Sequence, residues 1–356
     1  MTGRVLLDGN IWQGRRVLLT GHTGFKGSWL TLWLRRVGAE VTGISLPPNT
    51  DPNLFSLARI EEICTSRFCD IRERAALKIL IDEAEPEIIF HLAAQPLVRP
   101  SYREPVETFE TNVMGTSHVL DALRGLACAR VAVIVTTDKV YRNHEASRPF
   151  SEEDALGGHD PYSASKAASE IVTASYRNAF LAEQGIAVAS ARAGNVLGGG
   201  DWSEDRLIPD AVRAWQKGRT LRVRNPDSIR PWQHVLESLA GYLTLAEELW
   251  RQPALAGAYN FGPEADQTAT VREVVESARN SYGSGKIHFG DGGDGLHEAE
   301  WLALEITKSN RVLGVKTRWE LKEAIGKTMS WYRTLAEGAA ARDLCETQIA
   351  EYEGLL

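Results

Sequence analysis

Several features that would direct a chain to a membrane or to an oxidising compartment are missing from this sequence. It has only four cysteines in 356 residues, and no two of them form a CxxC pair, so we expect a reducing environment and no metal site. The opening Met-Thr-Gly-Arg lacks the apolar core of a signal peptide. No stretch approaches the roughly 18 uninterrupted apolar residues that a membrane span requires. These absences predict a cytoplasmic protein without a membrane partner.

An excess of positive charge is also missing. The formal net charge is −7 at pH 7, which argues against a nucleic-acid partner but allows a local basic site for an anionic small molecule. With 43% apolar and 24% charged residues, the chain is long enough to bury a large core and to form two domains.

Short β-rich runs alternate with helical patterns along the first half of the chain. The β-rich runs cover residues 16–20, 41–45, 87–90, 130–137 and 186–192. The helical patterns cover residues 25–37, 72–84, 105–124 and 162–184. This alternation predicts an α/β fold in which crossover helices flank a parallel sheet.

The regular alternation fades after Asn195 and returns as a helical run at 234–250 and a short strand at 259–261. Arginine and proline are prominent between these two regions. We therefore expect two interleaved domains. The first comprises residues 14–196 plus about 234–262, and the second, a smaller α/β domain, comprises residues 197–233 and 263–356.

A glycine-rich turn joins the first predicted strand to the first predicted helix. Gly21, Gly24 and Gly27 permit a tight turn, close approach of a pyrophosphate and close helix packing, with amides at the helix N-terminus facing the anion. Some glycine-rich turns serve only to fold the chain. The position after a strand and before a helix favours a Rossmann-type, doubly wound parallel sheet that binds a dinucleotide.

The residues after the second predicted strand bear on which dinucleotide is bound. Residues 44–48, Ile-Ser-Leu-Pro-Pro, contain no carboxylate to hold ribose hydroxyls and no Arg or Lys to pair with a 2′-phosphate. NAD is therefore the expected cofactor. Asp70 is placed either to accept a hydrogen bond from the adenine amine or to cap the following helix.

Tyr162 and Lys166 lie four residues apart, on one face of a predicted helix. A tyrosine hydroxyl has an unperturbed pKa near 10, and a nearby ammonium favours the phenolate, so such a pair can transfer protons. The segment 136–139, Thr-Thr-Asp-Lys, ends the apolar run 131–135. If this segment and the Tyr162/Lys166 pair meet at one site, the carboxylate of Asp138 and the amine of Lys139 join the pair. That is more acid–base equipment than a simple dehydrogenase needs.

Together these motifs resemble the extended short-chain dehydrogenases/reductases that act on nucleotide sugars. The resemblance covers nearly the whole chain and rests on the glycine turn, the Tyr162/Lys166 pair and the segments 91–94, 112–116 and 192–195. It implies that Thr137 hydrogen-bonds the sugar, while Tyr162 and Lys166 act beside the nicotinamide. The residues expected to bind NAD are Gly21, Thr23, Gly24, Phe25, Lys26, Gly27, Asp70, Ile71, Ala93, Tyr162 and Lys166.

The two residues after Thr137 narrow the resemblance. Dehydratases of deoxythymidine sugars carry Asp-Glu there, an acid for the C6 hydroxyl and a base for the C5 proton, whereas this chain has Asp138-Lys139. That pair resembles the CDP-glucose 4,6-dehydratases, as do the segments 94–98, 194–202 and 229–235. The implied catalytic residues are Thr137, Asp138, Lys139, Tyr162 and Lys166. Arginine forks suit phosphate oxygens, and the implied substrate-binding residues are Gln95, Asn195, Arg206, Arg224 and Arg230.

The resemblance implies that the chain dehydrates CDP-glucose through transient oxidation at C4 by NAD. A 4,6-dehydratase for another nucleotide sugar or a C4 epimerase would share most of these residues. A non-catalytic, dinucleotide-sensing regulator on the same fold would not need the proton-transfer set. The resemblance also implies a homodimer or homotetramer.

Overall fold

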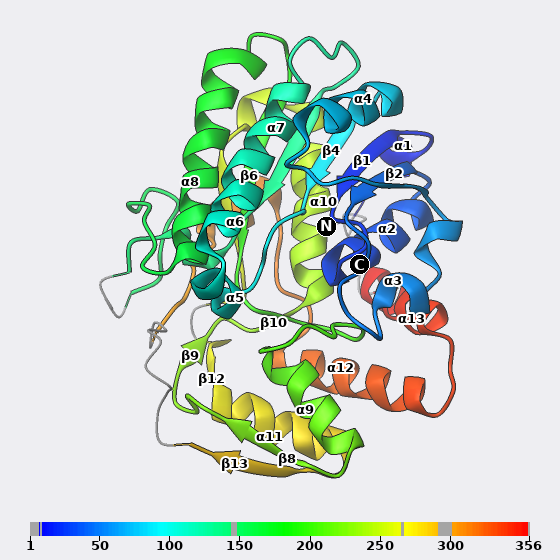
Figure 1. The fold of residues 1–356 in the computed structure, drawn as a ribbon, viewed down its shortest axis with the longest axis vertical. Helices are drawn as coiled ribbons and strands as arrows, with labels where there is room; N and C mark the ends of the chain where they lie inside the picture. Colours follow the sequence, from blue (N-terminus) through cyan, green and yellow to red (C-terminus); the bar gives the residue numbers. More distant parts are fainter. Residues whose placement is uncertain (1–6, 8, 144–147, 265–266, 291–300, 355–356) are drawn as a thin grey trace.

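The structure, a computed structural model, describes residues 7, 9–143, 148–264, 267–290 and 301–354. Its centre is a parallel sheet (Figure 1). In spatial order the seven strands are β11 (Ala258–Phe261), β6 (Ala187–Ala193), β5 (Val131–Val135), β4 (Ile88–His91), β1 (Arg16–Thr20), β2 (Glu40–Ser45) and β3 (Thr65–Phe68). The strand order reverses direction between β1 and β4, so the sheet is doubly wound, as the sequence predicts.

The five predicted β-rich runs correspond to β1, β2, β4, β5 and β6, and the short run at 259–261 pairs in parallel with β6 as β11. The strand β3 was not predicted. Its side chains are mostly exposed, so it lacks the apolar run by which the other strands are recognised.

Alternating side chains of the strands enter two separate hydrophobic cores, because successive residues of a strand point to opposite faces. Val131, Val133 and Val135 belong to one core, whereas Ala132 and Ile134 belong to the other. The first core is covered by α2 (Phe25–Arg36) and α10 (Val235–Arg251), and the second by α4 (Arg74–Ala84), α7 (Gly115–Ala122) and α8 (Pro161–Tyr176).

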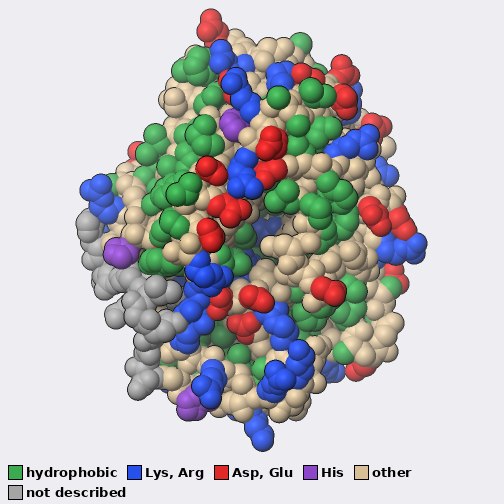
Figure 2. All heavy atoms as spheres, in the orientation of Figure 1, with side chains coloured by type: hydrophobic (Ala, Val, Ile, Leu, Met, Phe, Trp, Pro, Cys, Tyr) green, Lys and Arg blue, Asp and Glu red, His purple; other side chains and the backbone are tan. Residues whose placement is uncertain are grey.

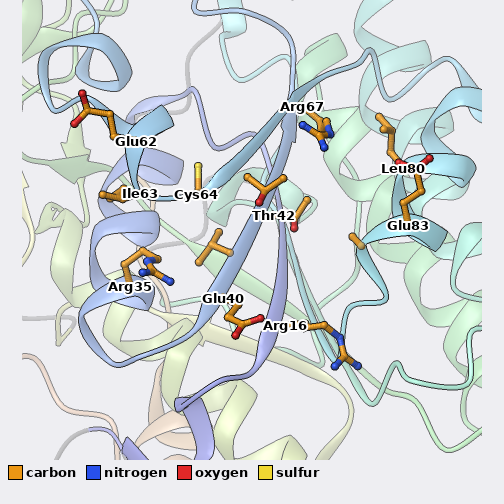
Figure 3. Close-up of a pocket in the computed structure, with 13 residues that line it drawn as sticks. Arg16, Arg35, Glu40, Thr42, Glu62, Ile63, Cys64, Arg67, Leu80 and Glu83 are labelled. Carbon is orange, nitrogen blue, oxygen red and sulfur yellow. The ribbon is translucent and has the colours of Figure 1, made fainter.

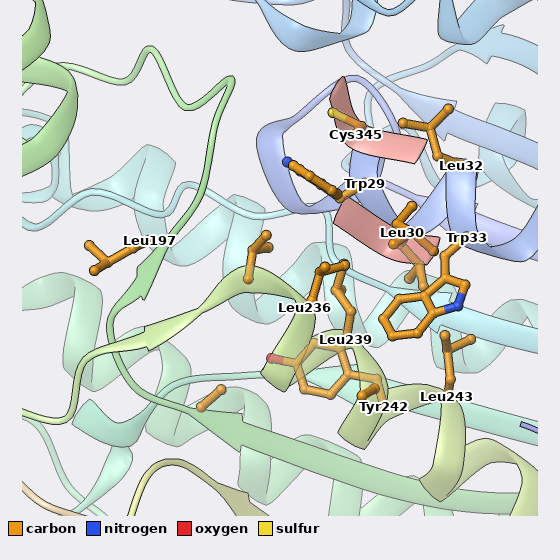
Figure 4. Packing of buried hydrophobic residues seen from close by; sticks show 14 of the residues in the cluster. Trp29, Leu30, Leu32, Trp33, Leu197, Leu236, Leu239, Tyr242, Leu243 and Cys345 are labelled. Carbon is orange, nitrogen blue, oxygen red and sulfur yellow. The ribbon is translucent and has the colours of Figure 1, made fainter. Parts of the chain in front are cut away.

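The larger core joins segments that are far apart in the sequence. Trp29 and Trp33 of α2 are fully buried and lie near Leu239 and Tyr242 of α10 (Figure 4). The last helix, α13 (Ala341–Gly354), also packs on α2, and the indole of Trp33 donates a 2.9 Å hydrogen bond to Glu353 Oε1. The C-terminal helix therefore stabilises the first crossover helix of the sheet.

Most predicted helices are present with small shifts of their ends. The run 105–124 forms α6 (Pro105–Phe109), a π-helical turn at Glu110–Met114 and α7, and the run 162–184 forms α8 and a π-helical turn at Arg177–Leu181. Gly38, at φ +92, follows the end of α2, a conformation that favours glycine. Among the described residues, the N-terminal half also contains the short α-helices α1 (Gly9–Trp12), α3 (Leu54–Leu57) and α5 (Val98–Arg103) and two 3-10 turns at Ile60–Glu62 and Asp138–Val140.

Smaller strand pairs and helices lie beyond the carboxyl ends of the main strands, in the lower part of Figure 1. Three two-stranded pairs are present, β10 with β7, β12 with β9 and β13 with β8. These strands are β7 (Val196–Leu197), β8 (Thr220–Val223), β9 (Ile229–Arg230), β10 (Gln233–His234), β12 (Ala269–Thr270) and β13 (Lys286–Phe289). The helices around them are α9 (Leu207–Gln216), α11 (Val271–Tyr282) and α12 (Leu321–Ala336).

Candidate active site

The glycine turn between β1 and α2 is shaped by contacts that leave no room for side chains. A Cβ on Gly27 would lie 2.0 Å from the carbonyl oxygen of Gly21. Gly21 has φ +81, and a Cβ there would lie 2.8 Å from the amide nitrogen of Ala93, which follows β4. The turn therefore closes at the point where the strand order reverses, which is where doubly wound sheets bind their ligands.

Gly24 faces outward in the same turn and caps α2 without a side-chain hydrogen bond. Thr23 ties the turn to the end of β2, since its hydroxyl donates to the carbonyl of Leu46 (2.9 Å) and lies 2.8 Å from Ser45 Oγ. The turn that leads to the amides at the start of α2 is thus held in a fixed position. This cradle fits a dinucleotide pyrophosphate.

Asp70 follows β3 and is held by a single arginine. Its Oδ2 accepts hydrogen bonds from Arg72 Nε (2.9 Å) and Nη2 (2.6 Å), and these bonds lower the pKa of the Asp70 carboxyl. The alternative that Asp70 caps the next helix is wrong, because α4 begins at Arg74 with Glu73 as its N-cap. The neighbouring Ile71 is buried in the core beneath α7.

Tyr162 and the end of β5 meet in the interior. Asp160 caps α8 by accepting a hydrogen bond from the amide of Ser163, which places Tyr162 in the first turn of the helix. Thr137 lies close enough to Tyr162 to act on the pKa of its hydroxyl. Burial raises the pKa of Tyr162 to about 12, against the lowering effect of Thr137.

Lys166 lies one turn further along α8 and is also buried. Its Nζ donates to the carbonyl of Val135 (3.2 Å), just before the segment 136–139. Burial lowers the pKa of Lys166 to about 8, while Glu170 acts to raise it. The structure therefore brings the Tyr162/Lys166 pair and the end of β5 together at one site.

Asp138 is the most buried acid of this cluster, with 1% of its surface exposed. Its Oδ1 accepts a hydrogen bond from Thr137 Oγ1 (2.9 Å), and its buried Oδ2 has no hydrogen-bond partner among the described residues. Burial raises the pKa of the Asp138 carboxyl, although Lys139, Arg230 and Lys26 oppose that shift. The protein interior therefore favours the protonated form of Asp138 more than bulk water would.

Lys26 contributes a third amine to the cluster. Its Nζ donates to the hydroxyl of Tyr242 on α10 (3.2 Å) and lies 5.5 Å from the centre of that ring. Burial first, then Arg206 and Lys166, lower the pKa of Lys26 to about 7. The glycine motif predicted that Lys26 contacts the cofactor. Nothing in the sequence indicated that its amine also lies near Asp138.

The five residues predicted to contact substrate are not equivalent in the structure. Arg230 is buried and acts on the pKa of Asp138, and Arg206 acts on the pKa of Tyr162, so both lie close to the reactive cluster. Arg224 is farther out, with 42% of its side chain exposed. Figure 2, drawn in the orientation of Figure 1, shows a hollow near the middle of the visible face of the molecule, bordered by acidic and basic side chains.

Gln95 and Asn195 belong to loops at the carboxyl ends of β4 and β6. The side chain of Gln95 accepts from the amide of Leu97 in the same loop (2.6 Å) and donates to Thr108 Oγ1 on α6 (3.0 Å), so both ends of its amide are engaged. The carbonyl of Asn195 accepts from the amide of Gln233 (3.1 Å), which links its loop to β10.

Another hollow lies at the amino ends of the strands (Figure 3). Its lining mixes three arginines with three glutamates and includes the first residues of β1, β2 and β3. The ligand sites of open α/β sheets lie at the carboxyl ends of the strands. This hollow is thus on the wrong side of the sheet for the cluster around Asp138.

The described residues contain no group of three or more His, Cys, Asp or Glu side chains arranged to hold a metal ion. Across the same part of the chain, every helix is too short or too polar to cross a lipid bilayer.

A Rossmann-type sheet with this glycine turn and a buried Tyr-x-x-x-Lys pair defines the extended short-chain dehydrogenase/reductase class. Within it, the family model described as GDP-mannose 4,6 dehydratase matches residues 18–328. The CDP-glucose 4,6-dehydratase of Salmonella typhimurium is 43% identical over 353 residues, which cover 98% of each chain. The chain therefore belongs to the nucleotide-sugar dehydratase family of this class.

More distant relatives agree with this placement. The probable dTDP-glucose 4,6-dehydratase of Sinorhizobium fredii is 29% identical over 89% of this chain and 92% of its own. The fold is shared with the dTDP-glucose 4,6-dehydratase of Bacillus anthracis in complex with NAD (TM-score 0.75, 22% identity, 90% and 97% coverage). It is also shared with the UDP-glucose-4-epimerase of Stenotrophomonas maltophila with bound NAD (TM-score 0.78, 23% identity, 91% and 99% coverage).

Proposed function

We propose that this protein is a carbon–oxygen lyase that removes water from CDP-D-glucose to give CDP-4-keto-6-deoxy-D-glucose. The observation that carries the proposal is the buried Asp138, which burial shifts toward its protonated form beside Thr137 and Tyr162. A C4 epimerase needs only the tyrosine and lysine, whereas water loss needs an additional acid. Similarity along nearly the whole chain to a CDP-glucose 4,6-dehydratase supports the choice of substrate.

NAD is the proposed cofactor, and the side-chain-free cradle at Gly21 and Gly27 supports it. Bound NAD would accept a hydride from C4 of the sugar and return one to C6. The residues proposed to hold it are Gly21, Thr23, Gly24, Phe25, Lys26, Gly27, Asp70, Ile71, Ala93, Tyr162 and Lys166.

In the proposed reaction Tyr162 takes the proton of the sugar 4-hydroxyl while Thr137 holds that hydroxyl. With a pKa of about 12, Tyr162 needs help to act as a base at neutral pH. This pKa already includes the lowering effect of Arg206, so the proposed help comes from Lys166, one helical turn later. Thr137, which donates a hydrogen bond to Asp138 and acts on the pKa of Tyr162, keeps the first and second proton transfers at one position.

For the elimination itself, Asp138 would donate its proton to the departing C6 hydroxyl and Lys139 would remove the C5 proton. A buried carboxyl with a raised pKa is suited to the acid role. Lys139 lies close enough to Asp138 to lower the pKa of that carboxyl. The proposed base role of Lys139 rests on the resemblance of the Asp138-Lys139 pair to the CDP-glucose 4,6-dehydratases.

The proposed substrate contacts are Gln95, Asn195, Arg206, Arg224 and Arg230. We also propose that residues 14–196 and about 234–262 form the NAD-binding domain, with residues 197–233 and 263–356 as the nucleotide-sugar domain. The small strand pairs β8–β13 and β9–β12 within the second set of residues support this division.

The proposed assembly is a homodimer or homotetramer in the cytoplasm, acting early in the synthesis of deoxysugars for a lipopolysaccharide O-antigen. Large apolar side chains are exposed on the neighbouring helices α6 and α8 and their π-helical turns, which supports a subunit contact there. They are Val106, Phe109, Met114, Ile171 and Phe180.

The test is a panel of CDP-, dTDP-, GDP- and UDP-sugars incubated with the protein and NAD, with products identified by mass and NMR. We expect loss of water from CDP-glucose in preference to the others. Dehydration of another nucleotide sugar would replace the proposed substrate, and a C4-inverted sugar of unchanged mass would identify an epimerase. Binding of NAD with no product from any sugar would favour the non-catalytic regulator.

A further inference from the structure

The segment 198–202 is held in place by side chains of three helices. Each donates a hydrogen bond to a backbone carbonyl of the segment: Trp29 of α2 to Gly199 (2.9 Å), Arg213 of α9 to Trp202 (2.7 Å) and Tyr332 of α12 to Asp201 (2.5 Å). A Cβ on Gly199 would lie 2.0 Å from the ring of Trp331, so the backbone also packs closely against α12. Asp201 therefore occupies a fixed position.

The carboxylate of Asp201 is buried, with 4% of the residue exposed, and both of its oxygens are engaged. Oδ1 accepts a hydrogen bond from the amide of Ser203 (3.0 Å), and Oδ2 pairs with Nη1 of Arg206 (3.0 Å). The side chain of Arg206 is partly exposed, at 32%. A long side chain with this exposure gains conformational entropy by turning into solvent unless a partner holds it. Asp201 is such a partner.

Arg206 carries the effect of this pairing to the reactive cluster. Its charge lowers the pKa of both Tyr162 and Lys26. The other groups that face these two side chains are Thr137 and Asp138 after β5, Asp160 and Lys166 of the α8 region, and Tyr242 of α10. Asp138 and Asp160 raise the pKa of Tyr162, so the cation of Arg206 acts against them.

We infer that Asp201 is a positioning residue, which holds the guanidinium of Arg206 toward Tyr162 and Lys26. The inference rests on the proposed function, because Tyr162 is the proposed base for the sugar 4-hydroxyl. Asp201 acts on the reaction through Arg206, by fixing where that positive charge lies.

The substitution Asp201→Asn separates this role from a role in folding the loop. The amide oxygen of asparagine can still accept from the amide of Ser203, whereas its NH2 group meets the guanidinium of Arg206 as donor against donor. The segment 198–202 keeps the three hydrogen bonds to its carbonyls. Arg206 alone loses its partner, so its charge turns away from the cluster.

The test is the pH dependence of the first hydride transfer, measured as single-turnover formation of reduced cofactor at saturating CDP-glucose. With the charge of Arg206 displaced, the pKa of Tyr162 rises and less phenolate is present at each lower pH. We expect the acidic limb of Asp201→Asn to move up by about one pH unit, which makes the rate about tenfold lower at neutral pH and restores it at higher pH. Glu204→Gln, an exposed acid of the same loop, should match the wild type.

A double-mutant cycle shows whether the effect passes through Arg206. Arg206→Gln should move the same limb in the same direction, and adding Asp201→Asn to it should change the rate by less than about twofold. Asp201→Glu keeps the charge but displaces the carboxylate by one methylene group, so it should move the limb in the same direction by a smaller amount. Circular dichroism identifies any variant that has not folded, and Asp201→Glu carries the comparison if Asp201→Asn does not fold.

Two results would overturn the inference: a loss of rate in Asp201→Asn that is equal at every pH, or an undiminished loss when Arg206 is already glutamine. Crystal structures supply a measure that needs no activity, since we expect the guanidinium of Arg206 to be displaced in Asp201→Asn and the segment 198–202 to be unchanged. A guanidinium that stays in place would also contradict the inference. Failure of the proposed function has a separate signature: a wild type that binds NAD but forms no reduced cofactor with CDP-glucose refutes the activity, whereas a displaced guanidinium still supports the positioning role.

Discussion

Glu170 and Arg192 form an ion pair inside the protein, with Oε2 and Nη2 2.9 Å apart and side chains only 3% and 5% exposed. Glu170 also accepts hydrogen bonds from the hydroxyls of Thr136 (2.5 Å) and Ser190 (2.6 Å). It stands one helical turn after Lys166 on α8. The pair therefore joins α8 to the ends of β5 and β6, immediately beneath the residues proposed to react.

Breaking this pair should destabilise the protein strongly. Glu170→Ala leaves the Arg192 guanidinium buried without its carboxylate, so we expect a loss of about 3–5 kcal/mol in the free energy of unfolding, measured by urea denaturation. Arg148→Ala is the matched control, because the Arg148–Asp154 pair is largely exposed on the arginine side, and its loss should destabilise the protein much less. Equal losses in the two variants would contradict the importance of the buried pair.

Replacing Asp138 by Asn should separate the two halves of the proposed reaction. The amide keeps the shape of the side chain but cannot supply the proton for the C6 hydroxyl, so we expect dehydration to slow by about 10²- to 10⁴-fold. NAD affinity should not change, and reduced cofactor should accumulate during single turnover with CDP-glucose. Dehydration at the wild-type rate would remove Asp138 from the acid role.

The glycine turn offers a test of steric fit. A methyl group in Gly27→Ala would lie 2.0 Å from the carbonyl oxygen of Gly21, so the turn must shift and we expect NAD affinity to fall by at least about tenfold. Gly326→Ala, in α12 with nothing within 4 Å of the added methyl, should stabilise the protein by about 0.5–1 kcal/mol. Calorimetry with NAD and thermal unfolding measure the two effects, and NAD affinity equal in both variants would argue against close packing at Gly27.

The lowered pKa of Lys166 predicts a pH dependence of stability. Burial moves this pKa from 10.5 to about 8 in the folded protein, so between these values the unfolded chain binds more protons. Lys166 therefore lowers the free energy of unfolding at pH values below about 8, where it must be buried with its charge. This penalty decreases as the pH rises from about 8 to 10.5, so the protein becomes more stable across this window.

We expect the free energy of unfolding of the wild type, relative to Lys166→Met, to increase by on the order of 3 kcal/mol between about pH 8 and 10.5. Urea unfolding of the cofactor-free proteins at several pH values measures it. The exposed Lys217→Met variant should follow the wild type throughout. A difference between wild type and Lys166→Met that does not change with pH would show that Lys166 titrates normally.

The proposed subunit contact predicts which apolar residues control assembly. Val106 and Ile171 are 69% and 61% exposed on α6 and α8, and a carboxylate at an apolar interface would be buried without a partner. The double variant Val106→Asp, Ile171→Asp should be smaller by light scattering than the wild type. Ile79→Asp, at 58% exposure on α4, should leave the mass unchanged. A wild-type mass in the double variant would place the interface elsewhere.

Much of the fold was predictable because its information is local in the sequence. The apolar runs of β1, β4, β5 and β6 are buried on both faces of a parallel sheet, so each appears as a continuous hydrophobic segment. The edge strand β3 was not predicted, because it has only one paired neighbour and its side chains are mostly exposed. The alternative that Asp70 caps the following helix was wrong, because its carboxylate accepts a hydrogen bond from Arg72 and α4 begins only at Arg74.

The sequence by itself determined the class of protein, because the patterns that identify it are short-range. They are the glycine turn, the Tyr162/Lys166 pair and the segments 91–94, 112–116 and 192–195. Only the tertiary structure decided the electrostatics of the site. Lys26, Asp138 and Arg230 are separated by many residues, and only folding brings their charges together in an interior where burial shifts pKa values. Packing likewise brings Asp205 Oδ1 within 3.2 Å of Arg224 Nη1 and 3.7 Å of Arg99 Nε, and no local pattern in the sequence indicates these contacts.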